Sequence, residues 1–486
     1  MDVEIPSDRR DGDVDWSELP ADLLVTVFTA LEIPDLICCA AVCRSWRDHY
    51  YSSTRRLGLC RNSHGPCLLT TSPTGVATLH RLSTGKLYRI PLPDMPPSAD
   101  TIFGNPYHHP LPGGAPLRDR YVVGSSHGWL VTADELSELH LLNPITGAQF
   151  PLPPLRSLAP VRLLFRKNDL TTFYGHSIRD ITPRRPKHNP RVPILKYDAA
   201  ETRYHLYQRA VLSGDPSSQG RKCTVVVIHN PWNLLSFARL GDATWTWLAL
   251  RPDCLGYQDC FFDDDGLLYA VRSCGEIQTI DFNGSAPVVN CICVPLKHAF
   301  DRANYIVRAP WGDILLVWRS FELNDAEEPG TYELAVFKLD LATEDLVQIK
   351  DLRGHALFVS FGTSFFVSVN DFPVLTPNCV YLAHDSTKCR RFEHIAKEIR
   401  VYNLQDDTFA DQYTQSSWKN CPPPALWVQP TCIRMEQSQH GNIEIPQMYG
   451  DIQLMPFVDY YTLITLKTIA ISMCGSLDLS GEWYVT

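Results

Sequence analysis

Residues 124–128, Gly-Ser-Ser-His-Gly, have the Gly-x-Ser-x-Gly spacing of the nucleophile elbow found in many hydrolases. That motif activates a serine only where a strand turns sharply into a helix, because the strained turn exposes the hydroxyl. The residues that follow here, Trp129-Leu-Val-Thr, favour a strand instead. We therefore interpret the pentapeptide as a turn between two strands and not as a catalytic site.

Other residues that could bind a metal ion lack the spacing that such a site needs. Three adjacent carboxylates, Asp263 to Asp265, cannot all turn toward one ion without the alternating positions of a calcium loop. Neighbouring cysteines and histidines have no second half with zinc spacing; they are Cys60, His64 and Cys67, the pair Cys291 and Cys293, and the pair His108 and His109. The sequence has no glycine-rich nucleotide motif. We therefore expect a protein that is not an enzyme and that has no cofactor and no metal.

Charge and composition indicate the kind of partner and the cellular compartment to expect. The formal net charge is −10, whereas nucleic-acid binding needs a basic field, so we expect protein partners and no nucleic acid. Residues 1–15 are acidic and polar, without the apolar stretch of a secretory signal, which predicts a place in the cytoplasm, the nucleus or both. The 16 cysteines are then expected to be thiols. Lys467 interrupts the apolar residues 460–473, so we expect no membrane span.

Residues 16–50 have the pattern of three short helices. Pro20 suits the first turn of a helix, an apolar stripe at helical spacing follows, and Pro34 ends it. Asp35 can cap a second helix, and a third runs through Val42 and Trp46. So small a module cannot bury all of its large side chains by itself, so a partner is expected. The alternative is an N-terminal cap that packs on the domain downstream.

This segment resembles the F-box, the module by which substrate receptors bind a Skp-type adaptor in a cullin-based ubiquitin ligase. The resemblance rests on the order Leu-Pro, Asp-Leu-Leu, Phe, Leu, Asp-Leu and Val-Cys-Arg-Ser-Trp within residues 19–46. It implies an F-box domain at residues 16–56 after a disordered stretch at residues 1–15. It also implies that nine residues contact the adaptor or hold the helices together: Leu19, Pro20, Leu23, Leu24, Val27, Phe28, Leu36, Val42 and Trp46.

Strand patterns recur from residue 67 to residue 410 as hairpins with Gly, Asn or Asp in the turns. Six inner turns are expected at residues 72–75, 126–129, 230–233, 263–266, 310–313 and 361–363. The same number of outer turns is expected at residues 83–85, 143–147, 241–244, 281–284, 340–343 and 403–406. Repeats of this length predict a six-bladed β-propeller of four-stranded blades. A β-sandwich, or two separate β domains, is the alternative.

The β region resembles the C-terminal KIB-type propeller of a plant F-box family. The matching motifs are residues 126–130, 142–144, 210–213, 245–247, 256–259, 378–381 and 424–427. The predicted fold is thus multidomain α+β, with a three-helix F-box followed by a propeller at residues 60–430. The resemblance implies a substrate-recognition subunit of an SCF-type ubiquitin ligase, which binds a Skp-type adaptor, through it a cullin, and a target protein. The alternative is a non-ligase interaction protein that sequesters a regulatory partner.

Two segments depart from this pattern. Residues 156–203 are rich in Arg, Lys and Pro and are expected to form a long basic loop inserted between blades. Arg184, Arg185 and Lys187 in this loop could bind an acidic target, although such runs are usually only solvated. Residues 431–486 form an atypical C-terminal extension.

Tryptophans beside turns of three blades are further candidates for target binding. They are Trp129, Trp232 and Trp311. Exposed tryptophans often anchor interfaces. The alternative is that they pack between neighbouring blades, and we favour this for at least two of the three.

Overall fold

The structure is a computed structural model of the full chain. It describes residues 16–31, 35–40, 42–50, 65–71, 76–91, 120–144, 148–166, 169–176, 195–248, 256–284, 286–293, 302–323, 329–340, 342–343, 345–383, 399–410 and 425–430. The chain divides into two compact units, and the described residues up to Tyr50 belong to one of them. The described residues from Gly65 onward belong to the other. The expected disorder of residues 1–15 and the extension at residues 431–486 lie outside the described residues.

The described residues of the N-terminal unit form short helices. They are η1 (Trp16–Glu18), α1 (Ala21–Ala30), α2 (Asp35–Ala40) and α3 (Arg44–His49). Helix α1 begins after Pro20, whose carbonyl accepts a hydrogen bond from the Leu24 amide at 3.0 Å. It ends at Leu31, which has extended backbone. Helix α3 begins after Cys43, whose sulfur accepts a hydrogen bond from the Trp46 amide at 3.4 Å.

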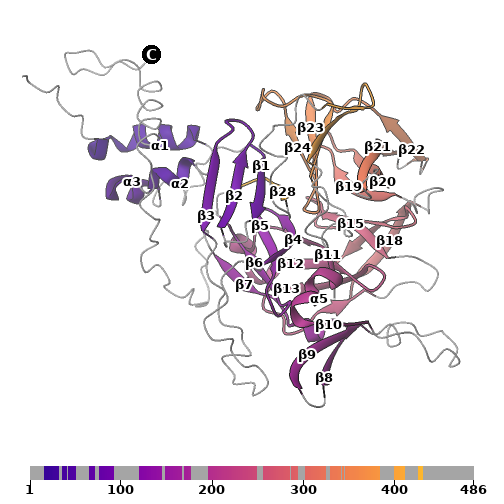
Figure 1. The fold of residues 1–486 in the computed structure, drawn as a ribbon. Coiled ribbons are helices and arrows are strands. Elements are labelled where there is room, and N and C mark those ends of the chain that lie inside the picture. The colour runs from indigo at the N-terminus through magenta and orange to yellow at the C-terminus, as the bar shows by residue number, and fades with distance from the viewer. Residues whose placement is uncertain are drawn as a thin grey trace, which may run out of the picture. The chain divides into compact units, whose positions relative to one another are not determined.

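The second unit is a six-bladed β-propeller, as the repeats predict. Blade 1 has the strand order β28 (Ala425–Val428), β1 (Cys67–Thr71), β2 (Val76–Arg81) and β3 (Leu87–Pro91). Blade 2 has the order β4 (Tyr121–Ser126), β5 (Trp129–Ala133), β6 (Leu139–Leu142) and β7 (Gln149–Pro151). Blade 3 has the order β11 (Tyr207–Leu212), β12 (Thr224–His229), β13 (Leu234–Arg239) and β14 (Thr246–Trp247). In Figure 1 these sheets follow one another around a common centre.

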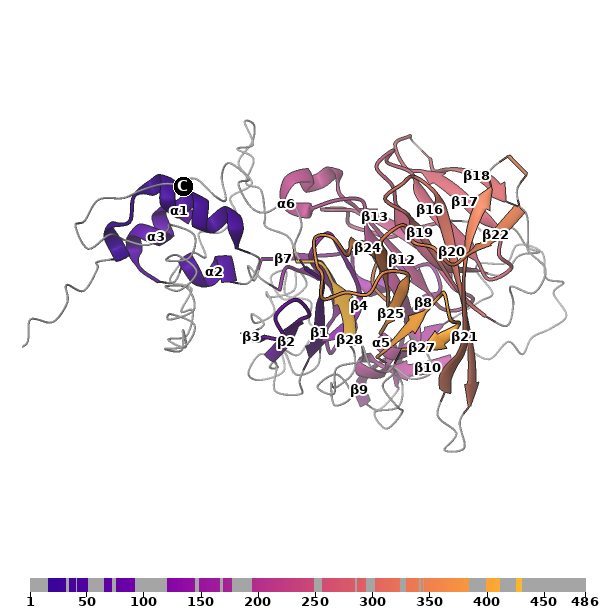
Figure 2. The same ribbon diagram turned by 90° about the horizontal axis from the view of Figure 1, so that it is seen from above.

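Blades 4 to 6 continue the ring. Blade 4 has the strand order β15 (Tyr257–Phe262), β16 (Leu268–Arg272), β17 (Ile277–Asp281) and β18 (Val288–Cys293). Blade 5 has the order β19 (Ala303–Arg308), β20 (Ile314–Leu323), β21 (Pro329–Asp340) and β22 (Asp345–Ile349). Blade 6 has the order β24 (Phe365–Ser368), β23 (His355–Val359), β25 (Cys379–Leu382), β26 (Arg400–Asn403) and β27 (Thr408–Phe409). Blade 6 has five strands, because β23 pairs in parallel with β25 and antiparallel with β24. Strands β20 and β21 pair along a hairpin that extends beyond the rest of blade 5 (Figure 2).

The expected loop at residues 156–203 is wrong in part, because this segment forms regular elements where it is described. Strands β8 (Val161–Arg166), β9 (Asp169–His176) and β10 (Leu195–Asp198) make a separate three-stranded sheet. Helix α5 (Ala199–Leu206) follows, capped by the Asp198 carboxylate, which accepts the Glu201 amide. Runs such as Val-Arg-Leu-Leu-Phe-Arg in β8 carry enough apolar residues for a strand despite their arginines. The other short elements are η4 (Leu155–Ser157), α6 (Pro216–Gln219) and η5 (Gly220–Lys222).

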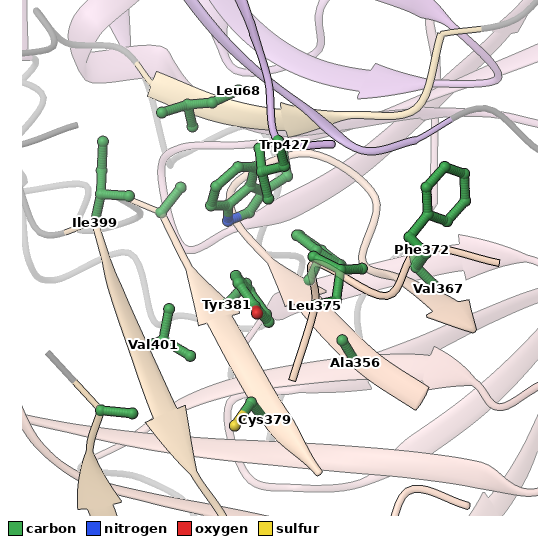
Figure 3. Packing of buried hydrophobic residues seen from close by; sticks show 14 of the residues in the cluster. Leu68, Ala356, Val367, Phe372, Leu375, Cys379, Tyr381, Ile399, Val401 and Trp427 are labelled. Atoms are coloured by element: carbon green, nitrogen blue, oxygen red, sulfur yellow. The ribbon is translucent and has the colours of Figure 1, made fainter. Parts of the chain in front are cut away.

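The two ends of the propeller meet in blade 1, where β28 pairs with β1 in antiparallel register, Leu68 opposite Trp427. The Trp427 ring packs edge-on against Phe358 of blade 6, with centroids 5.2 Å apart. Figure 3 shows Trp427 and Tyr381 in the same buried core. The last described strand therefore closes the ring.

The fold changes the assignment of some predicted turns, because β28 precedes β1 in blade 1 and β11 precedes β12 in blade 3. Residues 126–129, 263–266 and 310–313 join the first and second strands of their blades, as expected. Residues 230–233 instead join the second and third strands of blade 3. Residues 72–75 lie outside the described residues, but they fall between β1 and β2, which are the second and third strands of blade 1.

A buried ion pair links four blades near the centre of the ring. Arg209 of blade 3 lies 3.1 Å from Asp259 of blade 4, and both side chains are almost fully buried. Asp259 also accepts the Ile306 amide of blade 5 at 3.0 Å. Arg209 donates to the carbonyls of Ser360 and Gly362, which follow the first strand of blade 6, at 3.2 and 2.9 Å. Replacement of either Arg209 or Asp259 by a neutral residue would leave the other charge buried without compensation and would remove contacts to several blades.

Candidate functional site

The F-box helices share one apolar core. Phe28 of α1 is fully buried and lies edge-on to Trp46 of α3, with ring centroids 5.9 Å apart. Tyr50 packs on Phe28 from the other direction, with centroids 6.3 Å apart. Leu24 and Leu36 belong to the same buried cluster, so the core joins α1, α2 and α3.

Burial divides the nine predicted adaptor-contact residues into two groups. The buried group is Leu19, Leu24, Val27, Phe28, Leu36 and Trp46. Pro20 is exposed, and Leu23 and Val42 are half-buried. The first group therefore forms the core, whereas Leu23 and Val42 pack against it and still keep part of their apolar surface accessible. That these residues contact an adaptor stays a prediction.

Trp129 packs inside the propeller. Its side chain is fully buried, and its indole N–H donates to Asp215 of the neighbouring blade at 2.9 Å. The Phe150 ring lies 5.5 Å away on its own blade. A side chain held in this way cannot reach a partner, so we withdraw Trp129 as a target contact and keep its alternative role in packing.

Trp232 and Trp311 remain accessible. Trp232 is 41% exposed in the turn between β12 and β13. Trp311 is half-buried in the turn between β19 and β20, and its indole N–H donates to Asp313 at 2.8 Å. Sequence reasoning missed Arg353, whose guanidinium carbon lies 5.1 Å from the centroid of the Trp311 ring. Its signal would have been the turn sequence Asp-Leu-Arg-Gly at residues 351–354.

The Gly-x-Ser-x-Gly segment joins strands β4 and β5, so it lacks the strand-to-helix turn of a nucleophile elbow. Gly124 is required by packing, since a Cβ there would lie 2.2 Å from the Ala210 carbonyl oxygen of blade 3. The Ser126 hydroxyl donates to the Leu212 carbonyl at 3.4 Å. His127 sits in the turn with φ of 52°, and burial lowers its pKa against the opposing effect of Asp215. The segment thus acts as a contact between blades.

The three adjacent carboxylates form a hairpin turn. Asp263 makes an ion pair with Arg308 of blade 5. Asp265 accepts the Leu267 amide at 2.8 Å and the Tyr269 hydroxyl at 3.0 Å. Asp264 is exposed. Asp263 and Asp265 therefore have different partners, and the segment forms the expected hairpin turn.

Several predicted sites cannot be located. Arg184, Arg185 and Lys187 lie outside the described residues, as do Cys60, His64, His108 and His109. Cys67, Cys291 and Cys293 form no disulfide bond, and the Cys67 and Cys291 thiols donate to the carbonyls of Gly65 and Cys293. Within the described residues, no group of three or more His, Cys, Asp or Glu could hold a metal ion. No helix in the same part of the chain is long and apolar enough to cross a membrane.

Comparison with known proteins places both units in recognised families. An F-box-like family model matches residues 16–55. F-box protein At5g55150 of Arabidopsis thaliana is 24% identical over 425 residues, 86% of this chain and 98% of that protein. F-box protein KIB2 of the same plant is 23% identical over 54% of this chain and 52% of its own length. The F-box/kelch-repeat protein KIB1 of Arabidopsis thaliana is 22% identical over 54% of this chain and 54% of its own length. The KIB1-4 beta-propeller model matches residues 79–403, more than half of the sequence, and the chain belongs to this family.

Proposed function

We propose that this chain is the substrate-recognition subunit of an SCF-type ubiquitin ligase, working in the cytoplasm, the nucleus or both. Residues 16–56 act as a three-helix F-box that binds a Skp-type adaptor and, through it, a cullin. Residues 60–430 bind the target protein. The chain then promotes ubiquitin transfer by proximity, which raises the effective concentration of the target near the ubiquitin-charged enzyme.

The observation that carries this proposal is the division of apolar side chains in the F-box helices. Leu24 and Phe28 face the shared core, whereas Pro20, Leu23 and Val42 keep accessible surface. In such a module, the buried side chains stabilise the helices and the accessible side chains can contact a partner. The F-box names of the relatives support the identity of the docking partner.

The test is binding of a purified Skp-type adaptor to the full chain. Leu23→Asp together with Val42→Asp introduces charge on two half-buried side chains at the rim of the core, and circular dichroism of the variant checks that its helices remain folded. Two lost anchors at about 2 kcal/mol each should weaken adaptor binding by roughly a thousandfold. Adaptor binding that is as tight for this double variant as for wild type contradicts the assignment.

Leu87→Asp is the matched control, because Leu87 is 58% exposed on a propeller edge strand and also exchanges an apolar group for a charge. It should leave adaptor binding unchanged. Co-purification of a cullin with the wild type then separates a ligase subunit from a protein that only sequesters a regulator. Adaptor binding without any cullin favours the second function.

A further inference from the structure

An exposed arginine is stacked on a tryptophan where blade 5 meets blade 6. The guanidinium carbon of Arg353 lies 5.1 Å from the centroid of the Trp311 ring. Phe366 and His355 of blade 6 support that ring, with centroids 5.4 Å and 5.6 Å away. We call Trp311, Arg353, His355 and Phe366 the Trp311 platform.

The Trp311 ring has a fixed orientation. Its indole N–H donates to the Asp313 carboxylate at 2.8 Å, and Lys338 lies 2.9 Å from the same carboxylate. Burial opposes ionisation of Asp313, but the hydrogen bonds from Lys338 and Trp311 outweigh it and hold the pKa of that carboxyl below its ordinary value. The ring is therefore positioned before any partner arrives, which reduces the entropy lost on binding.

The backbone holds Arg353 in a conformation that arginine rarely adopts. Its φ is 51°, and that of Gly354 is 74°. The Arg353 amide donates to the Asp351 carboxylate at 2.8 Å, and its carbonyl lies 2.9 Å from Nδ1 of His355. The Gly354 carbonyl accepts the Val369 amide at 3.0 Å. A left-handed non-glycine residue persists only where its surroundings impose it, and such residues cluster at functional sites.

The Arg353 guanidinium also differs from its cationic neighbours in its charge environment. Arg308 is paired with Asp263, and Lys350 with Asp407. In the part of the chain that the structure describes, no carboxylate forms an ion pair with Arg353. Asp351, the nearest acid in sequence, accepts a backbone amide instead. The donors of this exposed guanidinium are therefore available to a ligand.

We propose that the Trp311 platform binds an acidic, extended segment of the target protein. A carboxylate of that segment can form two parallel hydrogen bonds with Arg353, while an adjacent side chain packs on the rings of Trp311 and Phe366. Trp and Arg are the residues that most often dominate interfaces. The net charge of −10 repels an acidic segment from much of the protein, which favours binding at Arg353, whose charge acts on Asp313 but which forms no ion pair among the described residues. The proposal rests on the proposed function, since it assumes that the propeller binds the target.

The test is a selection of peptides from a random displayed library, with the full chain bound to its adaptor as bait. Wild type should enrich peptides rich in Asp and Glu. One enriched peptide, synthesised with a fluorophore, is then titrated against variants. Arg353→Glu should weaken its binding by about a hundredfold, because it loses the paired hydrogen bonds and adds repulsion. Arg353→Lys keeps the charge and should lose less.

Arg221→Glu is the matched control, because Arg221 is exposed in η5 of another blade and undergoes the same change of charge. It should bind the peptide as wild type does. Absence of acidic enrichment by wild type overturns the proposal, and so does equal binding by Arg353→Glu. If Arg353→Glu lowers the melting temperature, Arg353→Gln replaces it as the decisive variant. Adaptor binding, measured on the same samples, reports separately on the ligase assignment.

Discussion

At the scale of single residues, Phe28 and Leu23 should separate folding of the F-box helices from docking. Phe28 is fully buried between Trp46 and Tyr50, so Phe28→Ala should cost about 3–5 kcal/mol of local stability. Leu23 is half-buried, and Leu23→Ala should cost about 1 kcal/mol. Hydrogen exchange of the amides in residues 16–50 of the full chain measures both costs.

Adaptor binding should fall in both of these variants, for different reasons. Phe28→Ala should lose amide protection together with binding, because the core no longer holds the helices. Leu23→Ala should lose much less protection than Phe28→Ala and still weaken binding. Equal loss of protection in the two variants would show that the division into core and docking residues is wrong.

Two buried histidines should make the propeller less stable in mild acid. Burial lowers the pKa of His229 and of His140 to about 4, from an ordinary value of 6.5, and Arg120 adds to the effect at His140. The unfolded chain therefore takes up these protons at a higher pH than the folded chain. The free energy of unfolding should fall as the pH drops from 6.5 to about 4, by about 2 kcal/mol for each histidine between about pH 7 and pH 5. Urea titrations at the two pH values measure the loss.

His229→Asn isolates one of these contributions. In the fold, Nδ1 of His229 lies 3.0 Å from the Asn230 carbonyl and Nε2 lies 2.8 Å from the Ser236 hydroxyl, an arrangement that suits the neutral ring. The variant will be less stable at neutral pH, but its further loss at pH 5 should be smaller by about 2 kcal/mol than that of wild type. An unchanged pH dependence contradicts the assignment to His229.

At the scale of elements, local patterns predicted strands and turns well but not their long-range pairing. Alternating apolar residues and turn residues such as Asp-Asp-Asp-Gly at 263–266 predict β15 and β16 because hairpins are local structures. Pairing of β1 with β28 depends on segments at opposite ends of the propeller, and nothing in either segment specifies the other. Nor does any local signal predict the parallel pairing of β23 with β25, since β24 and its turns intervene.

The closing strand β28 gives the prediction at this scale. A chain that ends at residue 424 lacks β28 and removes Trp427 from the core that it shares with Leu68 and Tyr381. It also leaves the edge of β1 unpaired, which favours aggregation. A chain that ends at residue 431 keeps the strand. Thermal melting followed by light scattering should show a lower transition and more aggregation for the shorter chain only.

The same comparison tests the C-terminal extension. Residues 432–486 lie outside the two predicted modules, so their removal should leave adaptor binding and propeller melting unchanged. A fall in propeller melting for the chain that ends at residue 431 would mean that residues beyond β28 contribute to the ring.

At the scale of the whole molecule, the sequence predicted the kind of protein better than its contact surfaces. The order of apolar residues from Leu19 to Trp46 and the repeated turns were enough to predict an F-box and a propeller. Trp129 and Trp311 occupy similar places beside blade turns, yet only the fold shows that the first is buried and the second accessible. The turn sequence at residues 351–354 marks a turn at Arg353 but not its contact with Trp311, because Trp311 belongs to another blade.

The last prediction is that residues 60–430 fold by themselves. Among the described residues, buried apolar clusters span five of the junctions between blades, including Leu69 with Val122 between blades 1 and 2. At the sixth, Trp245 of blade 3 donates to the Pro153 carbonyl, which follows blade 2, at 2.8 Å. Because β28 closes the ring on β1, this closure needs no strand from the F-box.

The isolated propeller should therefore give a β-dominated circular dichroism spectrum and one cooperative melting transition. A strongly helical spectrum for residues 60–430, or a melt in several steps, would contradict a closed propeller.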